Sequence, residues 1–309
     1  MSACQPNPNS TMFNMIVYRD ELDQILAEVS TENKTVIIAV ANRAYVEGDK
    51  PMLDLFMDGF WYGENTRGLT DHLLIVAVDQ TSYERCRFLR LHCYKLETEG
   101  VEFSGEKLYM SEDFIEMMWR RTQFLGDVLK RGYNFIFTDM DVIWLRNPFN
   151  RLSSNETIDL QVSTDKFNGD DLSQANPINT GFYMTRSNNR TISLFNTWYG
   201  RKNASMGMKE QDVLQLLVRE GMFTHLGLQA RFLDTLFFSG FCQDSCDVNA
   251  VVTVHSNCCR SINAKVTDLT AVLRSWKGWK AAKRKSGNVT MPFQWPPHKT
   301  CRNSWRHQH

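Results

Sequence analysis

The sequence has no excess of charge of either sign. Its 309 residues include 35 Lys and Arg against 35 Asp and Glu, so the formal net charge is zero. Proteins that bind nucleic acid through a broad basic surface carry an excess of positive charge. We therefore expect no nucleic acid among the partners of this protein.

Long apolar runs are also missing. The longest candidates, TVIIAVA at 35–41 and HLLIVAVD at 72–79, have the length of strands and fall well short of the about 18 residues that cross a membrane. The first ten residues have no basic region followed by an apolar stretch, which a secretory signal would need. We expect no membrane anchor within this chain.

Cysteines and glycosylation sequons favour the secretory-pathway lumen all the same. The chain has eight cysteines. Roughly three Asn-X-Ser/Thr sequons would arise by chance in such a chain, and it has more. The six sequons begin at Asn9, Asn33, Asn155, Asn189, Asn203 and Asn288.

One cysteine cluster has two interpretations. Cys242, Cys246, Cys258 and Cys259 lie within 18 residues together with His255, a grouping that could hold zinc. The spacing lacks a pair of Cys-X-X-Cys knuckles, and two adjacent cysteines do not easily join one tetrahedral site. We expect disulfides here, with a pairing that the sequence leaves open.

Alternating strands and helices organise the first half. Buried-strand patterns at 35–41, 72–79 and 134–139 alternate with helix patterns at 51–63 and 111–131, the latter with Ser111 as N-cap and Gly132 beyond its end. This order predicts a doubly wound α/β sheet, in which ligands bind beyond the carboxyl ends of the strands.

The second half is more mixed. It has strand patterns at 158–165, 180–186 and 251–255, and helix patterns at 192–201, 209–220 and from about 266. We expect it to complete the same sheet, with helices on both faces, as one large domain.

The segment NFIFTDMDVIWLRNPF, residues 134–149, carries the strongest chemical signal. Asp139 and Asp141 leave a buried strand two positions apart, so their side chains point the same way. Two converging carboxylates repel each other, and a divalent cation relieves the repulsion. The pair predicts a metal site. Phosphohydrolases that form an aspartyl-phosphate share this pattern, but they require Thr where this chain has Ile143.

Four segments in order resemble plant members of glycosyltransferase family 77, the nucleotide-diphospho-sugar transferases. They are FTDMDVIWLRNPF, NTGFYMTRSN, KEQDVLQLL and VHSNCCRSINAKVTDL, and the likeness extends from about Thr35 to Lys280. The resemblance implies a GT-A fold, a UDP-sugar donor, a Mn²⁺ or Mg²⁺ ion and retention of anomeric configuration. It also implies the Golgi lumen, where related members, anchored in the membrane, build cell-wall polysaccharides or glycoprotein glycans.

The resemblance also assigns roles around the metal. Asp141 is implied as a direct ligand, and Asp139 as a ligand or a contact to the ribose and metal-bound water. His255 stands where relatives have a third ligand, and Lys265 where they bind the diphosphate. A set of carboxylates, imidazole and phosphate oxygens suits Mn²⁺.

Further residues are candidates for holding the donor. We expect the base near the end of the first strand, at Asn42 and Tyr45, with Arg121 on the helix that leads to the metal strand. Asp165 matches a family position that contacts sugar hydroxyls. Asn179 and Thr180 are expected to line the sugar pocket, where Gly181 permits close approach of the backbone.

Gln211 and Asp212 are the candidate catalytic residues. In KEQDVLQLL the apolar residues face a core, which leaves these two near the helix start and able to face the cleft. In relatives this dipeptide lies beside the sugar face opposite the diphosphate. A carboxylate there could act as nucleophile in a double displacement, and the alternative is front-face attack by the acceptor.

These observations predict a metal-dependent retaining glycosyltransferase that moves a sugar from a UDP-sugar to a hydroxyl of a glycan or glycoprotein. The alternative is a catalytically inactive protein of the same fold that binds glycans or nucleotide sugars. We expect an N-terminal segment with a short helix at 1–34, a nucleotide-binding half at 35–150, an acceptor-side half at 151–285 and a tail at 286–309.

Overall fold

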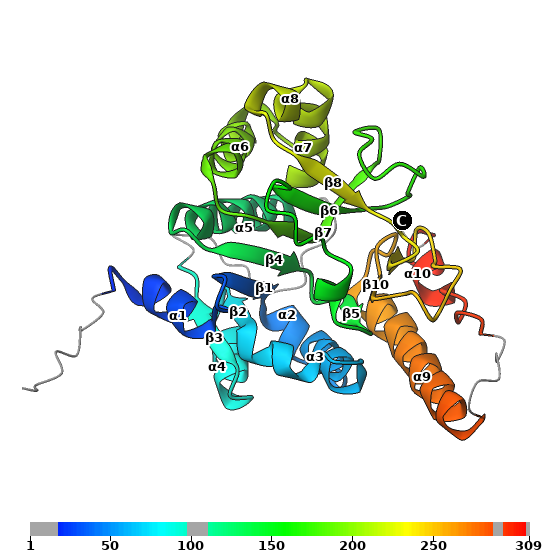
Figure 1. The fold of residues 1–309 in the computed structure, drawn as a ribbon. Coiled ribbons are helices and arrows are strands. Elements are labelled where there is room, and N and C mark those ends of the chain that lie inside the picture. The colour runs from blue at the N-terminus through cyan, green and yellow to red at the C-terminus, as the bar shows by residue number, and fades with distance from the viewer. Residues whose placement is uncertain (1–17, 98–110, 287–292, 307–309) are drawn as a thin grey trace, which may run out of the picture.

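A computed structural model of the chain describes residues 18–97, 111–286 and 293–306. A seven-stranded sheet lies between two layers of helices (Figure 1), so the predicted α/β class with helices on both faces is confirmed. Two of the predicted sequons, Asn9 and Asn288, lie outside the described residues. The other four begin at exposed asparagines.

The central sheet is mixed. Its strand order is β3-β2-β1-β4-β7-β6-β8, and β7 runs antiparallel to both of its neighbours. Four parallel strands therefore form one side of the sheet and three strands of mixed direction the other. The strands are β1 (Thr35–Ala41), β2 (Leu73–Ala77), β3 (His92–Lys95), β4 (Asn134–Thr138), β6 (Leu160–Thr164), β7 (Ile178–Thr185) and β8 (Ala230–Leu233).

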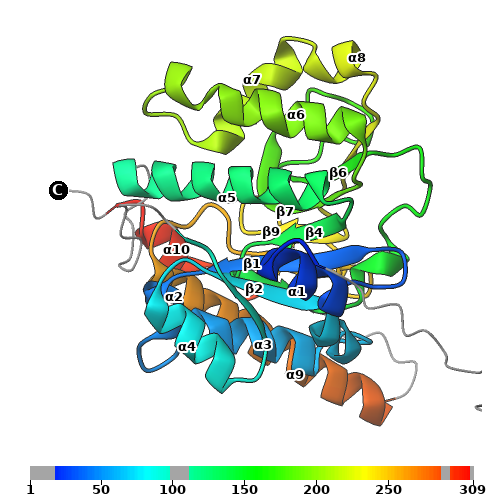
Figure 2. The same cartoon turned by 90° about the vertical axis from the view of Figure 1, so that its left-hand side faces the viewer.

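Both faces of the sheet are buried, as the unbroken apolar runs predict. In β1, Val36 and Ile38 join one hydrophobic cluster, and Ile37 and Ala39 join the other, because successive side chains point to opposite faces. Figure 2 shows the two helical layers. The first cluster is covered by α1 (Glu21–Val29), α5 (Glu112–Lys130), α6 (Asn189–Gly200), α7 (Glu210–Arg219) and α8 (Met222–Leu226). The second is covered by α2 (Arg43–Val46), α3 (Met52–Tyr62), α4 (Gln80–Phe88) and α9 (Ile262–Ser286).

The second half completes this sheet with β6, β7 and β8, as expected, and it also contributes to a second sheet that was not expected. Strands β9 (Phe238–Gly240) and β10 (Thr253–His255) pair with β5 (Val142–Trp144) in a separate three-stranded sheet. These strands are three residues long, too short for a periodic sequence pattern to reveal their pairing. Antiparallel pairing sets His255 opposite Val142, beside the predicted metal turn.

Short helical segments complete the described chain. They are η1 (Arg67–His72), η2 (Pro148–Asn150), η3 (Lys202–Ala204) and α10 (Lys299–Asn303). The predicted cap of α5 is present, since the Ser111 hydroxyl accepts a hydrogen bond from the Phe114 amide at 3.2 Å. No helix in the described parts of the chain is both long and apolar enough to cross a bilayer.

Six of the cysteines form disulfides. The pairs are Cys86–Cys93, Cys242–Cys258 and Cys259–Cys301. The zinc interpretation of the cysteine cluster is therefore wrong, because three of its cysteines form disulfides and cannot bind a metal. The adjacent Cys258 and Cys259 bond in different directions, one to the loop after β9 and the other to α10.

The predicted boundaries at 35 and 285 stay predictions. Residues before 35 and residues after 285 both pack against the domain. Leu26 and Val29 of α1 are fully buried in a core cluster, and Cys301 of α10 is 1% exposed in its disulfide with Cys259.

Candidate active site

A cavity of about 280 Å³ opens beyond the carboxyl ends of β1 and β4. This is the place where a doubly wound sheet binds its ligands. All of the predicted site residues except Asp212 line it: Asn42, Tyr45, Arg121, Asp139, Asp141, Asp165, Asn179, Thr180, Gln211, His255 and Lys265.

The turn after β4 presents the two acids. The Asp139 amide donates to the Gly181 carbonyl at 2.7 Å, and the Val142 amide donates back to the Asp139 carbonyl at 3.2 Å. Asp141 is almost fully buried, whereas a third of the Asp139 side chain is exposed. Both carboxylates lie in the cavity wall, so the predicted convergence occurs.

In each of the two carboxylates, one oxygen forms an ion pair with a basic side chain. The other oxygen faces the His255 ring. Arg121 Nη1 lies 2.8 Å from Asp139 Oδ1, and Lys265 Nζ lies 2.8 Å from Asp141 Oδ2. The remaining oxygens face the His255 ring, with Nε2 at 3.3 Å from Asp141 Oδ1 and 4.0 Å from Asp139 Oδ2. One ligand atom from each of the three residues lies within 4.8 Å of the other two.

These three side chains fit a divalent cation. Two carboxylate oxygens and an imidazole nitrogen form a donor set that suits Mn²⁺ and tolerates Mg²⁺ less well. Ser256 Oγ donates to Asp141 Oδ2 at 2.9 Å, which helps to orient that carboxylate. In the described parts of the chain, no other group of three such residues converges in this way.

The charges of the site are balanced in pairs. Burial acts to raise the pKa of Asp141, but Lys265 and His255 outweigh it and hold that pKa well below its usual range. Burial raises the pKa of the Asp139 carboxyl, which Arg121 only partly offsets. Burial disfavours the charged form of His255, yet the neighbouring Asp141 and Asp139 raise its pKa above the usual 6.5.

Lys265 and Arg121 therefore have a role that the sequence did not indicate. They were predicted to contact the donor, and both line the cavity, but each is paired with an acid of the metal turn. A cation at the far oxygen restrains the carboxylate and aims its other oxygen at the metal position.

The backbone at Gly181 lies close to the site, as predicted, and this closeness requires a glycine. A Cβ at this position would stand 2.9 Å from Asp139 Oδ2 and would collide with the His255 ring. The main chain of β7 thus lies directly against two of the three candidate ligands.

Asn42 and Tyr45 lie at one end of the cavity. Asn42 follows β1 directly, and its side chain lies 3.9 Å from the Met117 sulfur. Burial raises the pKa of the Tyr45 hydroxyl to about 12, so this group stays a neutral hydrogen-bond donor at physiological pH. The arrangement leaves an aromatic ring, an amide and apolar surface together at this end.

Asp165, Asn179, Thr180 and Gln211 lie at the other end. Asp165 Oδ1 accepts hydrogen bonds at 2.8 Å from the amides of Asn179 and Asn257. Gln211 Oε1 accepts from the Thr180 amide at 3.0 Å. Sequence reasoning missed Asn257, although it lies in the segment VHSNCCRSINAKVTDL, two residues after His255.

Glu210 is the second residue that sequence reasoning missed. It is 2% exposed, and its Oε1 accepts hydrogen bonds from Arg121 Nη2 at 2.6 Å and Thr180 Oγ1 at 2.8 Å. A first-turn acid ordinarily stabilises the helix N-terminus in solvent, so the sequence offered no sign of burial. Glu210 joins the metal turn to the sugar end of the cavity through Arg121 and Thr180.

The expectation that Asp212 faces the cleft is wrong. Its side chain is 45% exposed and its carboxylate lies 3.8 Å from Lys209 Nζ, outside the cavity lining. Successive residues of a helix are rotated by about 100°, so the turn that directs Glu210 and Gln211 inward carries Asp212 away. Of the two catalytic candidates, only Gln211 lies in the cavity wall.

Comparison with known proteins identifies the family. The sequence pattern of the nucleotide-diphospho-sugar transferases matches residues 68–269. The chain belongs to this family of GT-A-like glycosyltransferases, which confirms the resemblance and the predicted fold type.

The relatives include plant and amoebal proteins. An uncharacterized protein of Arabidopsis thaliana is 55% identical over 94% of this chain and 86% of its own length. A β-arabinofuranosyltransferase of the same plant is 26% identical over 71% of this chain and 41% of its own length. A UDP-galactose:fucoside α-3-galactosyltransferase of Dictyostelium discoideum is 41% identical over 31% of this chain and 15% of its own length.

Proposed function

We propose that this protein is a metal-dependent retaining glycosyltransferase that moves a sugar from a UDP-sugar to a hydroxyl of a glycan or glycoprotein. The observation that carries the proposal is the convergence of Asp139, Asp141 and His255 on one point in the wall of a cavity, in a chain that belongs to the nucleotide-diphospho-sugar transferases. Family membership supports the reaction class, and the three ligands support its dependence on a metal.

The donor would lie along the cavity. Asn42 and Tyr45 offer hydrogen bonds and an aromatic ring to the base at one end. Asp165 and Asn179 offer polar groups to the sugar at the other. The UDP-galactose donor in the name of the amoebal relative supports a uridine nucleotide.

Asp139, Asp141 and His255 would hold Mn²⁺ between these two ends. The ion supplies a Lewis acid that offsets the charge developing on the departing diphosphate. Lys265 helps to keep Asp141 ionised, Arg121 opposes the effect of burial on Asp139, and both cations orient the carboxylates. Because these two cations already offset the two carboxylates, we expect tight metal binding only when the donor diphosphate adds its negative charge.

We propose front-face transfer as the route to retention. A double displacement needs an ionised nucleophile beside the sugar, but Asp212 lies outside the cavity lining and Gln211 offers only an amide whose oxygen accepts hydrogen bonds from Thr180. The carboxylates that do line this end are engaged by other side chains, Asp165 by two amides and Glu210 by Arg121. In front-face transfer the acceptor hydroxyl attacks from the side of the leaving group, and a departing phosphate oxygen takes its proton. Gln211 would position the sugar and stabilise the positive charge developing on it.

We also propose the Golgi lumen as the compartment. Three disulfides within the described chain favour an oxidising compartment. Exposed sequons at Asn33, Asn155, Asn189 and Asn203 are compatible with passage through the secretory pathway.

A panel of UDP-sugars tests the proposal. Purified protein is incubated with each UDP-sugar, with and without Mn²⁺, and released UDP and the anomeric form of the product are measured. We expect Mn²⁺-dependent release from one donor or a few, with retention of configuration. UDP binding without turnover of any donor would support the inactive binding protein instead, and activity that survives strict chelation would refute the metal site.

A further inference from the structure

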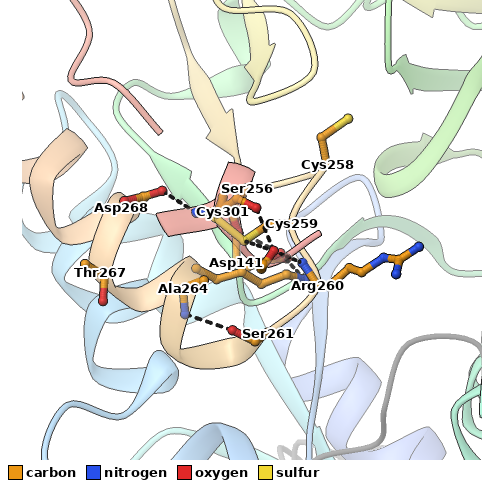
Figure 3. Close-up of a disulfide and its surroundings, with 12 residues drawn as sticks. Asp141, Ser256, Cys258, Cys259, Arg260, Ser261, Ala264, Thr267, Asp268 and Cys301 are labelled. Atoms are coloured by element: carbon orange, nitrogen blue, oxygen red, sulfur yellow. Dashed lines mark hydrogen bonds and ion pairs between the residues drawn. A yellow bond between two sulfur atoms is a disulfide. The ribbon is translucent and has the colours of Figure 1, made fainter. Parts of the chain in front are cut away.

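The C-terminal segment 293–306 forms part of the cavity wall. Its helix α10 is bonded to the stretch after β10 through the disulfide between Cys259 and Cys301, close to Asp141 (Figure 3). The last tryptophan of the chain, Trp305, lines the same cavity as the metal turn. A segment that the sequence marks only as a tail therefore contributes to the candidate active site.

Several contacts hold this segment in one position. The Cys301 amide donates to Asp268 Oδ2 at 2.8 Å, and the Trp295 indole donates to the Ser245 carbonyl at 2.7 Å. The His298 ring stacks on Phe241 with 3.6 Å between the ring centres. Since each contact joins the segment to the domain, Trp305 is placed before any ligand binds, which lowers the entropic cost of binding.

Trp305 and Arg260 form a pair at the cavity edge. The Trp305 indole donates to the Cys258 carbonyl at 2.8 Å, which fixes the plane of the ring. The Arg260 guanidinium lies over the ring, 3.9 Å from its centre, and 44% of the tryptophan remains exposed. The guanidinium covers part of the indole, and the exposed part of the ring offers apolar surface next to hydrogen-bond donors.

Covalent and hydrogen-bonded links connect this pair to the sugar end of the cavity. Cys258, which accepts from the indole, is bonded to Cys242, whose sulfur lies 3.6 Å from Asp165 Oδ1. Asp165 also accepts from Asn257, the residue before Cys258. The Trp305 pair is thereby tied to the end of the cavity that carries Asp165, Asn179 and Gln211, where an acceptor must approach the donor sugar.

We infer that Trp305 and Arg260 form the acceptor subsite, in which an acceptor sugar packs its apolar ring face on the exposed part of the indole and accepts hydrogen bonds from the guanidinium. The inference rests on the proposed transferase function. The family match ends at residue 269, and Trp305 lies 36 residues beyond it. The acceptor subsite would thus include a segment that lies beyond the residues matched by the family pattern.

Two assays on the same protein separate acceptor binding from donor chemistry. Hydrolysis of the preferred UDP-sugar in Mn²⁺ buffer reports donor and metal binding. Incorporation of the labelled sugar into a mixture of oligosaccharides from plant cell walls reports transfer. We expect Trp305→Ala to lower transfer about tenfold with hydrolysis little changed, and Trp305→Phe to restore most of the transfer. Trp61→Ala is the matched control, because Trp61 is 57% exposed and lies outside this cavity.

Arg260→Gln gives a second test that leaves the Cys259–Cys301 disulfide and the hydrogen bond of the Trp305 indole in place. We expect a raised acceptor KM and an unchanged donor KM. A raised donor KM would assign Arg260 to the diphosphate and overturn the inference, as would equal losses of hydrolysis and transfer in Trp305→Ala or unchanged transfer. Hydrolysis without any transfer by the wild type would also overturn it, whereas absence of hydrolysis in the wild type would refute the proposed function itself.

Discussion

The two walls of the cavity are held in place by different means. The wall that carries Asp139 and Asp141 follows β4, a central strand paired on both sides by a buried sheet. The opposite wall, formed within residues 238–265 and 293–306, has strands of only three residues and is held by the disulfides of Cys258 and Cys259. The core thus places the acids, the short pairing of β10 with β5 places the histidine, and cross-links hold the acceptor side against them.

The largest expected effect is on the wall held by the sheet. Asp141→Asn should lower transfer roughly 10²–10³-fold, because the amide is a poor ligand and does not neutralise Lys265. Turnover at saturating Mn²⁺ and UDP-sugar measures this loss. Asp212→Asn is the matched control and should stay near wild type, because Asp212 lies outside the cavity lining. A comparable loss in that control would return Asp212 to the reacting centre.

The contact between the two walls is tested by Gly181→Ala. The added methyl group would collide with His255 and press on Asp139, so we expect a roughly 10–100-fold loss of Mn²⁺ affinity. A titration followed by Mn²⁺ paramagnetic resonance measures it. Gly278→Ala is the control: it lies within α9 with open space around it, and the change should stabilise the protein by about 0.5–1 kcal/mol. Unchanged Mn²⁺ affinity in Gly181→Ala would contradict the described geometry.

The pH dependence of metal binding tests the same contact, between His255 and the two acids. Burial lowers the pKa of His255, but Asp141 and Asp139 outweigh it and leave the pKa above 6.5. Only neutral imidazole binds a metal, so Mn²⁺ affinity should fall as pH falls through this raised pKa, about tenfold one unit below it. The metal-free protein should show the opposite trend. The stabilisation from charged His255 is fully present below the unfolded pKa and is lost as pH rises through the folded one.

Calorimetry and Mn²⁺ titration across pH 5 to 9 measure both trends. His255→Gln should flatten both, because glutamine does not titrate. A wild-type affinity that is constant over this range would remove His255 from the ligand set.

The smallest effect on transfer is expected from the cross-links. Replacing Cys259 and Cys301 by serine should lower stability by about 3–4 kcal/mol, because the disulfide closes a loop of 42 residues, and should lower transfer about fivefold by loosening the Trp305 wall. Replacing Cys86 and Cys93 should cost about 2–3 kcal/mol with transfer unchanged, since that loop of seven residues lies away from the cavity lining. Thermal unfolding and transfer assays compare the pairs. If both replacements changed transfer equally, the conclusion that cross-links hold only the acceptor wall would be wrong.

Most of the sheet and the metal turn could be predicted because their signals are local. The apolar runs at β1, β2 and β4 reveal burial on both faces, and Asp139 and Asp141 share one strand end. Asp212 was misjudged because a helix start does not determine which residue faces inward. Glu210 was not predicted as a site residue because only tertiary packing buries it, between Arg121 and Thr180.

The sequence by itself determined the α/β order, the acidic pair and the family, since each depends on residues close together in the chain. Only the tertiary structure decided the pairing of the cysteines, the approach of His255 to Asp141 and the position of Trp305 in the cavity wall. Those contacts join residues more than 40 positions apart in most cases. No local pattern encodes such contacts, because they form only when the folded sheet and its disulfides bring distant segments together.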